Sequence, residues 1–408
     1  MSADAAEPSL WRDRDFNVFW LGQTLSGLGD AFALVATPLL VLRATGSLHK
    51  MGTLTALVAV AHVLSGLVSG AVVDRVDRRR LMIACDVGRF ALYSAVPLAW
   101  WLRGPSYLLL AAAACAGASL GNMFQVAAIT AVANLVPRPR LLEANGRMHG
   151  AYAVMMFVGP MAAGEVCQRV GPVAALAVDC GSYLVSGASL LLVRARLQSD
   201  APRERVRIVE GFASGLRFLW GTPVLRAITV LLAVSSLLLA GRENLLVFYV
   251  QRGLGGDDRA VGQVFALAAL GAAVGAVGSS WLRGRFGFGA CWLGGGACIG
   301  AAMLGIGVAR SLPLLAGLGA VLALGEAVRN VTTMTLRQEI TPDPLLGRVT
   351  AAFWALLTVP AALGAEVNAR LAERFGVERV VLGVGAGLLV VVLVGALGPI
   401  GRASAPRA

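Results

Sequence analysis

Charged residues are scarce in this sequence, since Asp, Glu, Lys and Arg make up 14% of its 408 residues, whereas about 25% is usual in a soluble protein. Hydrophobic residues make up 57%, and the mean hydropathy is +0.74. The apolar residues fall in runs of the length, about 20 residues, that an α-helix needs to cross a bilayer. This composition argues against a soluble enzyme and predicts a chain whose main solvent is lipid.

The sequence also lacks the motifs of ATP hydrolysis and of common catalytic sites. It contains no GxxxxGKS phosphate loop, no HExxH zinc motif and no GxSxG nucleophile elbow. None of its six cysteines belongs to a CxxC pair or lies at zinc-ligand spacing from a histidine, so we expect them to pack as small apolar residues. We therefore expect no enzyme, no metal and no cofactor, and an ion gradient as the driving force.

The net charge of +12 comes from basic residues in short segments between the apolar runs. This placement is typical of membrane topology rather than of a nucleic-acid partner, because Lys and Arg accumulate in cytoplasmic loops. Placing both termini in the cytoplasm puts about twice as many basic residues on that side as on the other. The start of the chain lacks a basic region and a cleavage site before the first apolar run. We expect a multi-pass protein of the cytoplasmic or inner membrane without a signal peptide.

Twelve apolar segments of spanning length can be placed, six on each side of a polar interval. Hydrocarbon offers no hydrogen-bond partners to the backbone, and barrel strands would appear as short alternating segments, so we expect helices. The predicted fold is an all-α membrane protein with twelve transmembrane helices in two pseudo-symmetric six-helix bundles. The expected spans lie near residues 17–42, 51–72, 81–102, 107–135, 144–167, 172–193, 224–250, 260–282, 288–309, 312–336, 347–369 and 377–400.

The polar interval predicts the domain organisation. The expected parts are a cytoplasmic N-terminus (1–16), a first bundle (17–193), a cytoplasmic central loop (194–223), a second bundle (224–400) and a cytoplasmic tail (401–408). Apolar residues interspersed among polar ones in the central loop predict a short amphipathic helix at the inner leaflet, and a plain linker is the alternative.

A weak internal repeat supports two halves. LVPRPRLL at 135–142 resembles ITPDPLLG at 340–347, and GPMAAG at 159–164 resembles VPAALG at 359–364. The two pairs have nearly equal offsets, close to half of the chain length, as expected for a duplicated bundle.

The most specific motif is GAVVDRVDRRRL at 70–81, between the second and third spans. It resembles the signature loop GxxxDRxGRR of the major facilitator superfamily of transporters, with Asp77 in place of a glycine. The glycine would allow close helix packing, the first aspartate would face a helix N-terminus and the arginines would form ion pairs across a gate. A basic loop that only follows the positive-inside rule is the alternative. The residues of this predicted gate are Gly70, Asp74, Arg75, Arg78 and Arg79.

Other stretches resemble one branch of this superfamily, the enterobactin-exporter-like and macrolide-efflux-like permeases. GLGDAFALVATPLLVLRATGS at 27–47 is similar to its first helix, EGFASGLRFLWGTPVLRAI at 210–228 to its central-loop helix and ITPDPLLGRV at 340–349 to the loop before helix eleven. The resemblance covers nearly the whole chain. It implies a secondary active transporter that exports amphipathic small molecules, such as a drug, antibiotic or siderophore, by proton antiport with alternating access.

The expected fifth helix contains VGPMAAG at 158–164, which is similar to the GPxxGG-type motif of antiporters at Gly159, Pro160 and Gly164. Proline removes a helical hydrogen bond and glycine removes side-chain bulk, so together they predict a bend at which helices can rock. An ordinary kinked membrane helix is the alternative.

Ionisable residues inside spans are energetically costly and are candidates for function. The proton-coupling candidates are Asp30, Glu326, Arg329 and His62. Asp30 and Glu326 lie about 20 Å along their helices, the depth of a central cavity. Glu326 and Arg329 are spaced i, i+3 and are expected to pair with each other, whereas Asp30 has no obvious partner. Structural roles in helix packing are the alternatives for each.

The substrate-cavity candidates are the amides Asn122 and Gln125 and the aromatic residues Phe353 and Trp354. Hydrogen bonding between helices is the alternative role of the two amides.

Asp86 and Arg89 are also spaced i, i+3 and lie only about 8 and 12 Å into their predicted helix. Because they follow the signature loop closely, we predict that they form a cytoplasmic gate network together with Arg348.

The predicted partners are a small amphipathic substrate and membrane lipids, and the chain is expected to act as a monomer. Within the same fold, a lipid-related permease or an importer is the alternative function. From another class, the chain could be a membrane sensor or assembly subunit without flux, which saturable substrate transport would exclude.

Overall fold

The computed structural model describes residues 10–137, 140–198 and 208–402, and within these ranges it contains helices and no strand. The first half comprises η1 (Leu10–Arg12), α1 (Arg14–Thr45), α2 (Leu48–Arg75), α3 (Arg78–Arg103), α4 (Tyr107–Leu135), α5 (Leu141–Arg169) and α6 (Pro172–Leu192). The central segment carries α7 (Ile208–Gly221). The second half comprises α8 (Pro223–Leu239), α9 (Arg242–Phe248), the π-helical turn η3 (Tyr249–Gly253), α10 (Asp258–Val308), α11 (Leu312–Ile340), α12 (Asp343–Phe375), α13 (Val377–Leu397) and α14 (Pro399–Arg402).

Eleven of the described helical segments are long and apolar enough to cross a membrane, and the longest of them contains two spans. Helix α10 has 51 residues, which would extend about 75 Å if straight, more than twice the roughly 30 Å of hydrocarbon. The chain reverses inside it at Gly287, where φ is 78° and ψ is 172°. A side chain would be strained at this φ, so glycine permits the turn. The predicted all-α fold of twelve spans in two six-helix bundles is confirmed.

Serine and aspartate side chains begin several of the spans. Ser47, Ser106 and Asp257 each accept a hydrogen bond from a backbone N–H in the first turn of the helix that follows. These bonds satisfy one of the donors that a helix start leaves free.

The span after the central segment is interrupted between α8 and α9. Helix α8 ends at Leu239, and Gly241 has a positive φ of 73° before α9 begins. The break leaves backbone carbonyls without helical partners, which is costly inside a membrane. The buried Asn368 of α12 meets this need, because its amide nitrogen donates to the carbonyls of Leu237, Leu238 and Ala240 at 3.3, 2.9 and 3.0 Å.

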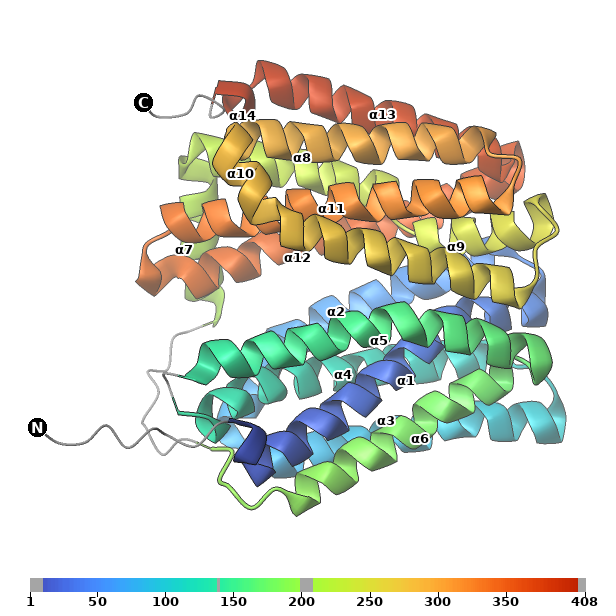
Figure 1. Cartoon of the computed structure of the whole chain (residues 1–408), viewed down its shortest axis with the longest axis vertical. Coiled ribbons are helices and arrows are strands. Elements are labelled where there is room, and N and C mark those ends of the chain that lie inside the picture. The colour runs from blue at the N-terminus through green and yellow to red at the C-terminus, as the bar shows by residue number, and fades with distance from the viewer. Residues whose placement is uncertain (1–9, 138–139, 199–207, 403–408) are drawn as a thin grey trace, which may run out of the picture.

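The two halves form two bundles whose helices run roughly parallel, with the first half below and the second above in Figure 1. The first and last described helices, η1 and α14, lie at the same end of the bundles, at the left of Figure 1, and we call this the terminus end. Between the halves, α2 packs against α12 and α5 against α10. Both pairs meet at the opposite end. Gly52 at the start of α2 approaches Ala365 near the end of α12, and Gly164 near the end of α5 approaches Gly262 near the start of α10. We call this the closed end.

Many large apolar side chains point away from both bundles. Trp101, Leu108, Val277 and Leu397 are each 79% exposed or more, and they come from four different spans. Such a surface would be unfavourable in water but matches hydrocarbon. The exposed apolar surface therefore marks the faces that contact lipid.

Candidate functional site

A cavity of about 900 Å³ lies within the first half and is lined by residues of α1 to α5. Its described lining residues all come from this half. The lining combines charged and amide groups with aromatic rings and small residues, which suits an amphipathic molecule. Polar and aromatic members of the lining are Gln23, Thr24, Ser26, Asp30, Thr37, His62, Arg89, Tyr93, Asn122, Phe124, Gln125, His149 and Tyr152.

A charged cluster forms one wall of this cavity. Arg89 of α3 donates to the Oδ1 of Asp30 on α1 at 2.9 Å and to the Tyr183 hydroxyl on α6 at 2.9 Å. Its guanidinium carbon also lies 4.0 Å from the centre of the Tyr183 ring, within the range of a cation–π interaction. Asp30 is 45% exposed and faces the cavity, whereas Arg89 is 12% exposed. The cluster thus presents an exposed carboxylate to the cavity, while its cation lies mostly buried in the same wall.

Two further carboxylates lie behind the arginine. The Tyr183 hydroxyl donates to the Oδ2 of Asp179 at 2.9 Å, and Asp179 is fully buried. Asp86 precedes Arg89 by almost one turn of α3, is 1% exposed and faces Gly187 of α6. Three carboxylates therefore share one described guanidinium, and we refer to Asp30, Asp86, Arg89, Asp179 and Tyr183 as the Arg89 cluster.

This arrangement corrects two expectations. Asp30 does have a partner, Arg89, which is 59 residues away in the sequence. Arg89 does not lie in a gate near the signature loop, because it lies about three turns into α3, about 17 Å from the helix start, and lines the cavity. A helix that began at residue 81, as the sequence predicts, would place Arg89 about 12 Å from its start, whereas α3 begins three residues earlier, at Arg78.

The other predicted polar residues of the first half also lie at the cavity. Asn122 of α4 donates to the His62 carbonyl at 3.1 Å and to the Ser65 hydroxyl at 3.0 Å. His62 and Gln125 line the same cavity. The Asn122 amide therefore links α4 to α2 and forms part of the cavity wall, so the two roles considered for it are compatible.

The predicted pair of Glu326 and Arg329 is not formed. Glu326 pairs with Arg242 at 3.0 Å, and Arg242 also contacts Glu243 at 3.0 Å. Arg329 is 6% exposed, and its guanidinium donates to the Ser235 hydroxyl at 3.3 Å. Helical spacing places Glu326 and Arg329 on one face of α11, but each of them binds a side chain of another helix instead of its neighbour. Arg242 of α9 binds Glu326, and Ser235 of α8 binds Arg329.

The two aromatic cavity candidates lie elsewhere. Phe353 is buried in the core of the second half, with the Arg337 guanidinium 4.4 Å from its ring centre. Trp354 is 49% exposed and packs edge to face on Phe353. Neither residue lines the cavity that contains Asn122 and Gln125. The same core includes Val349. Its neighbour Arg348, the third residue of the predicted gate network, packs its backbone carbonyl against Gly215 of α7.

The signature loop joins α2 to α3 at the terminus end. The surroundings of Gly70 and the side chain of Asp74 lie outside the described part of the structure. Arg78 is buried and donates to the Leu197 carbonyl at 3.1 Å, and Arg79 donates to the Ala195 carbonyl. These arginines attach the loop to the segment after α6, in the same half, while Arg75 is exposed.

The glycine motif of α5 lies where the two halves meet. Helix α5 is continuous through Pro160, and the bend there stays a prediction. A Cβ on Gly159 would lie 2.4 Å from the Ala31 side chain of α1, and a Cβ on Gly164 would lie 3.0 Å from the Gly262 Cα of α10. The small residues therefore let α5 approach both α1 in its own half and α10 in the other.

Polar contacts connect the halves at the closed end. Arg43 of α1 forms an ion pair with the buried Asp258 of α10. Glu165 of α5 pairs with Arg259 of α10 at 2.6 Å, and Glu366 of α12 accepts a hydrogen bond from Thr53 of α2 at 2.7 Å. Together with the glycine contacts, these bonds hold the closed end shut.

Sequence reasoning missed Asp179, Tyr183 and Asp258. Asp179 lies in the apolar run of the sixth span, so the rule that singled out Asp30 applied to it equally. Tyr183 follows it by one turn, which is the spacing of a shared helix face. Asp258 lies at a helix start, where aspartate is ordinary, so no signal in the sequence marked it.

Comparison with known proteins identifies relatives over most of the chain. Residues 19–365 match the family model described as the Major Facilitator Superfamily. The multidrug efflux pump Tap of Mycolicibacterium fortuitum is 26% identical over 370 residues, which cover 86% of this chain and 88% of the relative. The enterobactin exporter EntS of Citrobacter koseri is 24% identical over 86% of this chain and 83% of the relative. Macrolide efflux protein A of Streptococcus pyogenes is 25% identical over 48% of this chain and 50% of the relative.

Solved structures share the fold at low identity. A bacterial homologue of the human lysosomal transporter Spinster, in an inward-facing and unoccupied conformation, has a TM-score of 0.78 at 14% identity, covering 98% of this chain and 100% of that one. The nucleoside transporter NupG has a TM-score of 0.75 at 10% identity, covering 94% and 99%. These likenesses concern the architecture alone.

Proposed function

Because the chain belongs to the Major Facilitator Superfamily, we propose that it exports amphipathic small molecules across the cell membrane by proton antiport. The family makes it a membrane-embedded transporter rather than an enzyme, and the predicted resemblance to enterobactin and macrolide exporters is confirmed. The curated relatives named above are all called efflux or export proteins. Their names support export over the importer and lipid-permease alternatives.

The observation that carries the proton-antiport proposal is the charge balance of the Arg89 cluster. Asp30, Asp86 and Asp179 share one described cation, and the last two are almost fully buried. An unpaired buried charge is very costly, and a carboxyl group in this position keeps its proton instead. We infer that the cluster holds at least one exchangeable proton and that a substrate in the cavity competes for it at Asp30.

The described polar contacts between the two halves lie at the closed end, and this placement supports alternating access. We propose that the terminus end is cytoplasmic, as the distribution of Lys and Arg indicates, so the closed end faces outward. The halves 17–193 and 224–400 would then rock as two bodies around the cavity, breaking the closed-end contacts when the site opens outward. The conformation described here would be the inward-facing one.

The direct test is transport by the reconstituted protein. In liposomes with an imposed pH gradient, we expect wild type to move amphipathic compounds in a gradient-dependent way and Asp30→Asn to lose this dependence. Glu339→Gln is a matched control, because the same chemical change affects an exposed carboxylate paired with Arg283 at the terminus end. Gradient-independent flux in the wild type would refute proton antiport but leave export standing. Coupling retained in Asp30→Asn would move the proton site to another carboxylate.

Weakening the closed end should shift the balance of conformations. Asp258→Asn removes the charge that Arg43 binds, and a hydrogen bond to a charged group contributes roughly 1.5 kcal/mol or more, equivalent to about a tenfold change in population. A reporter cysteine at Thr37, which lines the cavity, would be labelled from outside about ten times faster in a background without the native cysteines. Unchanged labelling would show that this ion pair does not hold the closed end.

A further inference from the structure

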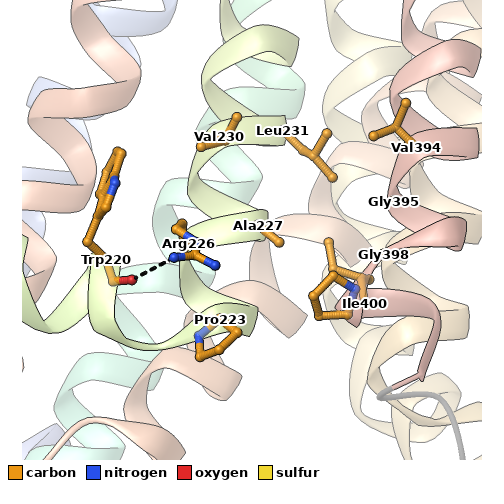
Figure 2. A pocket seen from close by; sticks show the side chains of 11 residues that line it. Trp220, Pro223, Arg226, Ala227, Val230, Leu231, Val394, Gly395, Gly398 and Ile400 are labelled. Atoms are coloured by element: carbon orange, nitrogen blue, oxygen red, sulfur yellow. Dashed lines mark hydrogen bonds between the residues drawn. The ribbon is translucent and has the colours of Figure 1, made fainter.

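A second cavity lies on the outside of the second half and shares no described lining residue with the cavity in the first half. It is a groove of about 430 Å³ between the start of α8 and the end of α13, closed at the terminus end by α14. Figure 2 shows Ala227 and Leu231 of α8 facing Val394 and Ile400 across it. Nothing in the transport cycle proposed above uses this groove.

The walls of the groove are apolar and lie on the lipid-facing surface. Val230 and Val394 at its edges are 44% and 52% exposed, and both come from membrane spans. Gly395 and Gly398 leave the wall on the α13 side without bulk. The groove therefore opens laterally into hydrocarbon, and its volume is that of a site for a small ligand.

The mouth of the groove differs from its walls, because it carries a single cation. Arg226 is exposed, and its described hydrogen bond goes to the Trp220 carbonyl at 3.4 Å, as Figure 2 shows. The described lining contains no acidic residue, and no described ion pair involves Arg226. The guanidinium charge is thus available to an anion at the point where the apolar groove begins.

The position along the membrane suits a lipid headgroup. Arg226 lies in the first turn of α8, and Trp220 lies at the end of α7, which crosses the terminus end of the bundle in Figure 1. Tryptophan is enriched where hydrocarbon meets water, and basic pockets at this level bind anionic headgroups. The Trp220 side chain is 46% exposed and borders the groove.

From the apolar groove with an unmatched cation at its mouth, we propose that this site holds one anionic phospholipid. An acyl chain lies between α8 and α13, and the phosphate lies against Arg226 beside Trp220. Such a lipid would join α7, α8 and α13 and so stabilise the second half at the terminus end. This site depends on the membrane fold alone, and its test does not require transport.

The experiment measures lipid binding by native mass spectrometry of purified protein, exposed to equal amounts of phosphatidylglycerol and phosphatidylethanolamine of the same chains. We expect retained phosphatidylglycerol in the wild type. Arg226→Gln should lower the preference for it about fivefold, since one basic residue near a membrane surface contributes about that factor. Arg217→Gln is the control, because Arg217 is exposed on α7 and does not line the groove. Equal retention of both lipids by the wild type, or a full preference in Arg226→Gln, would overturn the proposal.

Two further variants separate the other possible occupants. Ala227→Phe fills the groove and should lower retention of both lipids, whereas millimolar inorganic phosphate should not displace the bound lipid. Displacement by phosphate would mean an anion site without an acyl chain, which contradicts the proposal. A chain ending at residue 402 should bind phosphatidylglycerol as wild type does, and a large gain would instead assign the groove to residues 403–408.

Discussion

Arg89→Gln is expected to abolish proton-coupled efflux and to lower thermal stability more than any other single change to the cavity wall. The change removes the described cation of the Arg89 cluster, while Asp30, Asp86 and Asp179 remain. Loss of the ion pair with the half-exposed Asp30 costs little by itself, but Asp86 and Asp179 are buried, and removing a charge that compensates buried carboxylates costs up to roughly 3–5 kcal/mol. Tyr183 also loses two interactions with Arg89, the hydrogen bond to its hydroxyl and the cation–π contact with its ring. The measurements are the melting temperature in detergent and pH-driven flux in liposomes.

A double variant distinguishes charge balance from simple loss of packing. Arg89→Gln combined with Asp30→Asn removes one charge of each sign, so most of the lost stability should return while coupled flux stays absent. Arg89→Lys keeps the charge but loses the planar donor set that reaches both Asp30 and Tyr183, and we expect partial flux. If Arg89→Gln transported normally with an intact pH dependence, the Arg89 cluster would have no part in coupling.

Gly262→Leu is expected to prevent the closed end from shutting and to trap the protein open to the outside. A Cβ at this position would lie 2.3 Å from the Pro160 carbonyl oxygen and 2.9 Å from the Gly164 Cα. Both groups are backbone atoms of α5 and cannot move aside as a flexible side chain can. Overpacking in such a contact costs about 1–3 kcal/mol, which corresponds to roughly a fivefold to 150-fold change in the ratio of states.

The reporter cysteine at Thr37 measures this effect as faster labelling from outside, together with a loss of flux. Gly278→Leu is the matched control, because it makes the same substitution in the same helix where no atom lies within 4 Å of the added Cβ. Folded Gly262→Leu protein that still transports and resists outside labelling would mean that the α5 and α10 contact is not part of the gate.

The fold could be predicted because each span is a long apolar run, and lipid leaves such a run one conformation. The breaks inside the spans could not be predicted from the sequence. Gly241 and Gly287 are two glycines among 50, and only the positive φ of each distinguishes them as turns. A helix break is tolerated where another helix supplies donors, and the sequence does not reveal which helix does so.

The sequence predicted which ionisable residues belong to the candidate site, but not which of them contact each other. The cost of burying charge identified Asp30 and Arg89 separately, yet their contact depends on how α1 and α3 are rotated within the bundle. For Glu326, the nearest charge along its own helix was the wrong choice, since Arg242 reaches it from α9. Spacing along one helix sets which side chains share a face, whereas packing between helices decides which of them meet.

Asn368 has a consequence for the order of assembly during synthesis. The carbonyls at the end of α8 leave the ribosome about 130 residues before the amide that binds them. Until α12 is inserted, the carbonyls at this break lack the hydrogen bonds from Asn368, and leaving them unpaired in lipid would be costly. The span that contains α8 and α9 should therefore reach its final position late, after α12 arrives, and Asn368→Leu should slow maturation of the nascent chain before it alters the finished transporter.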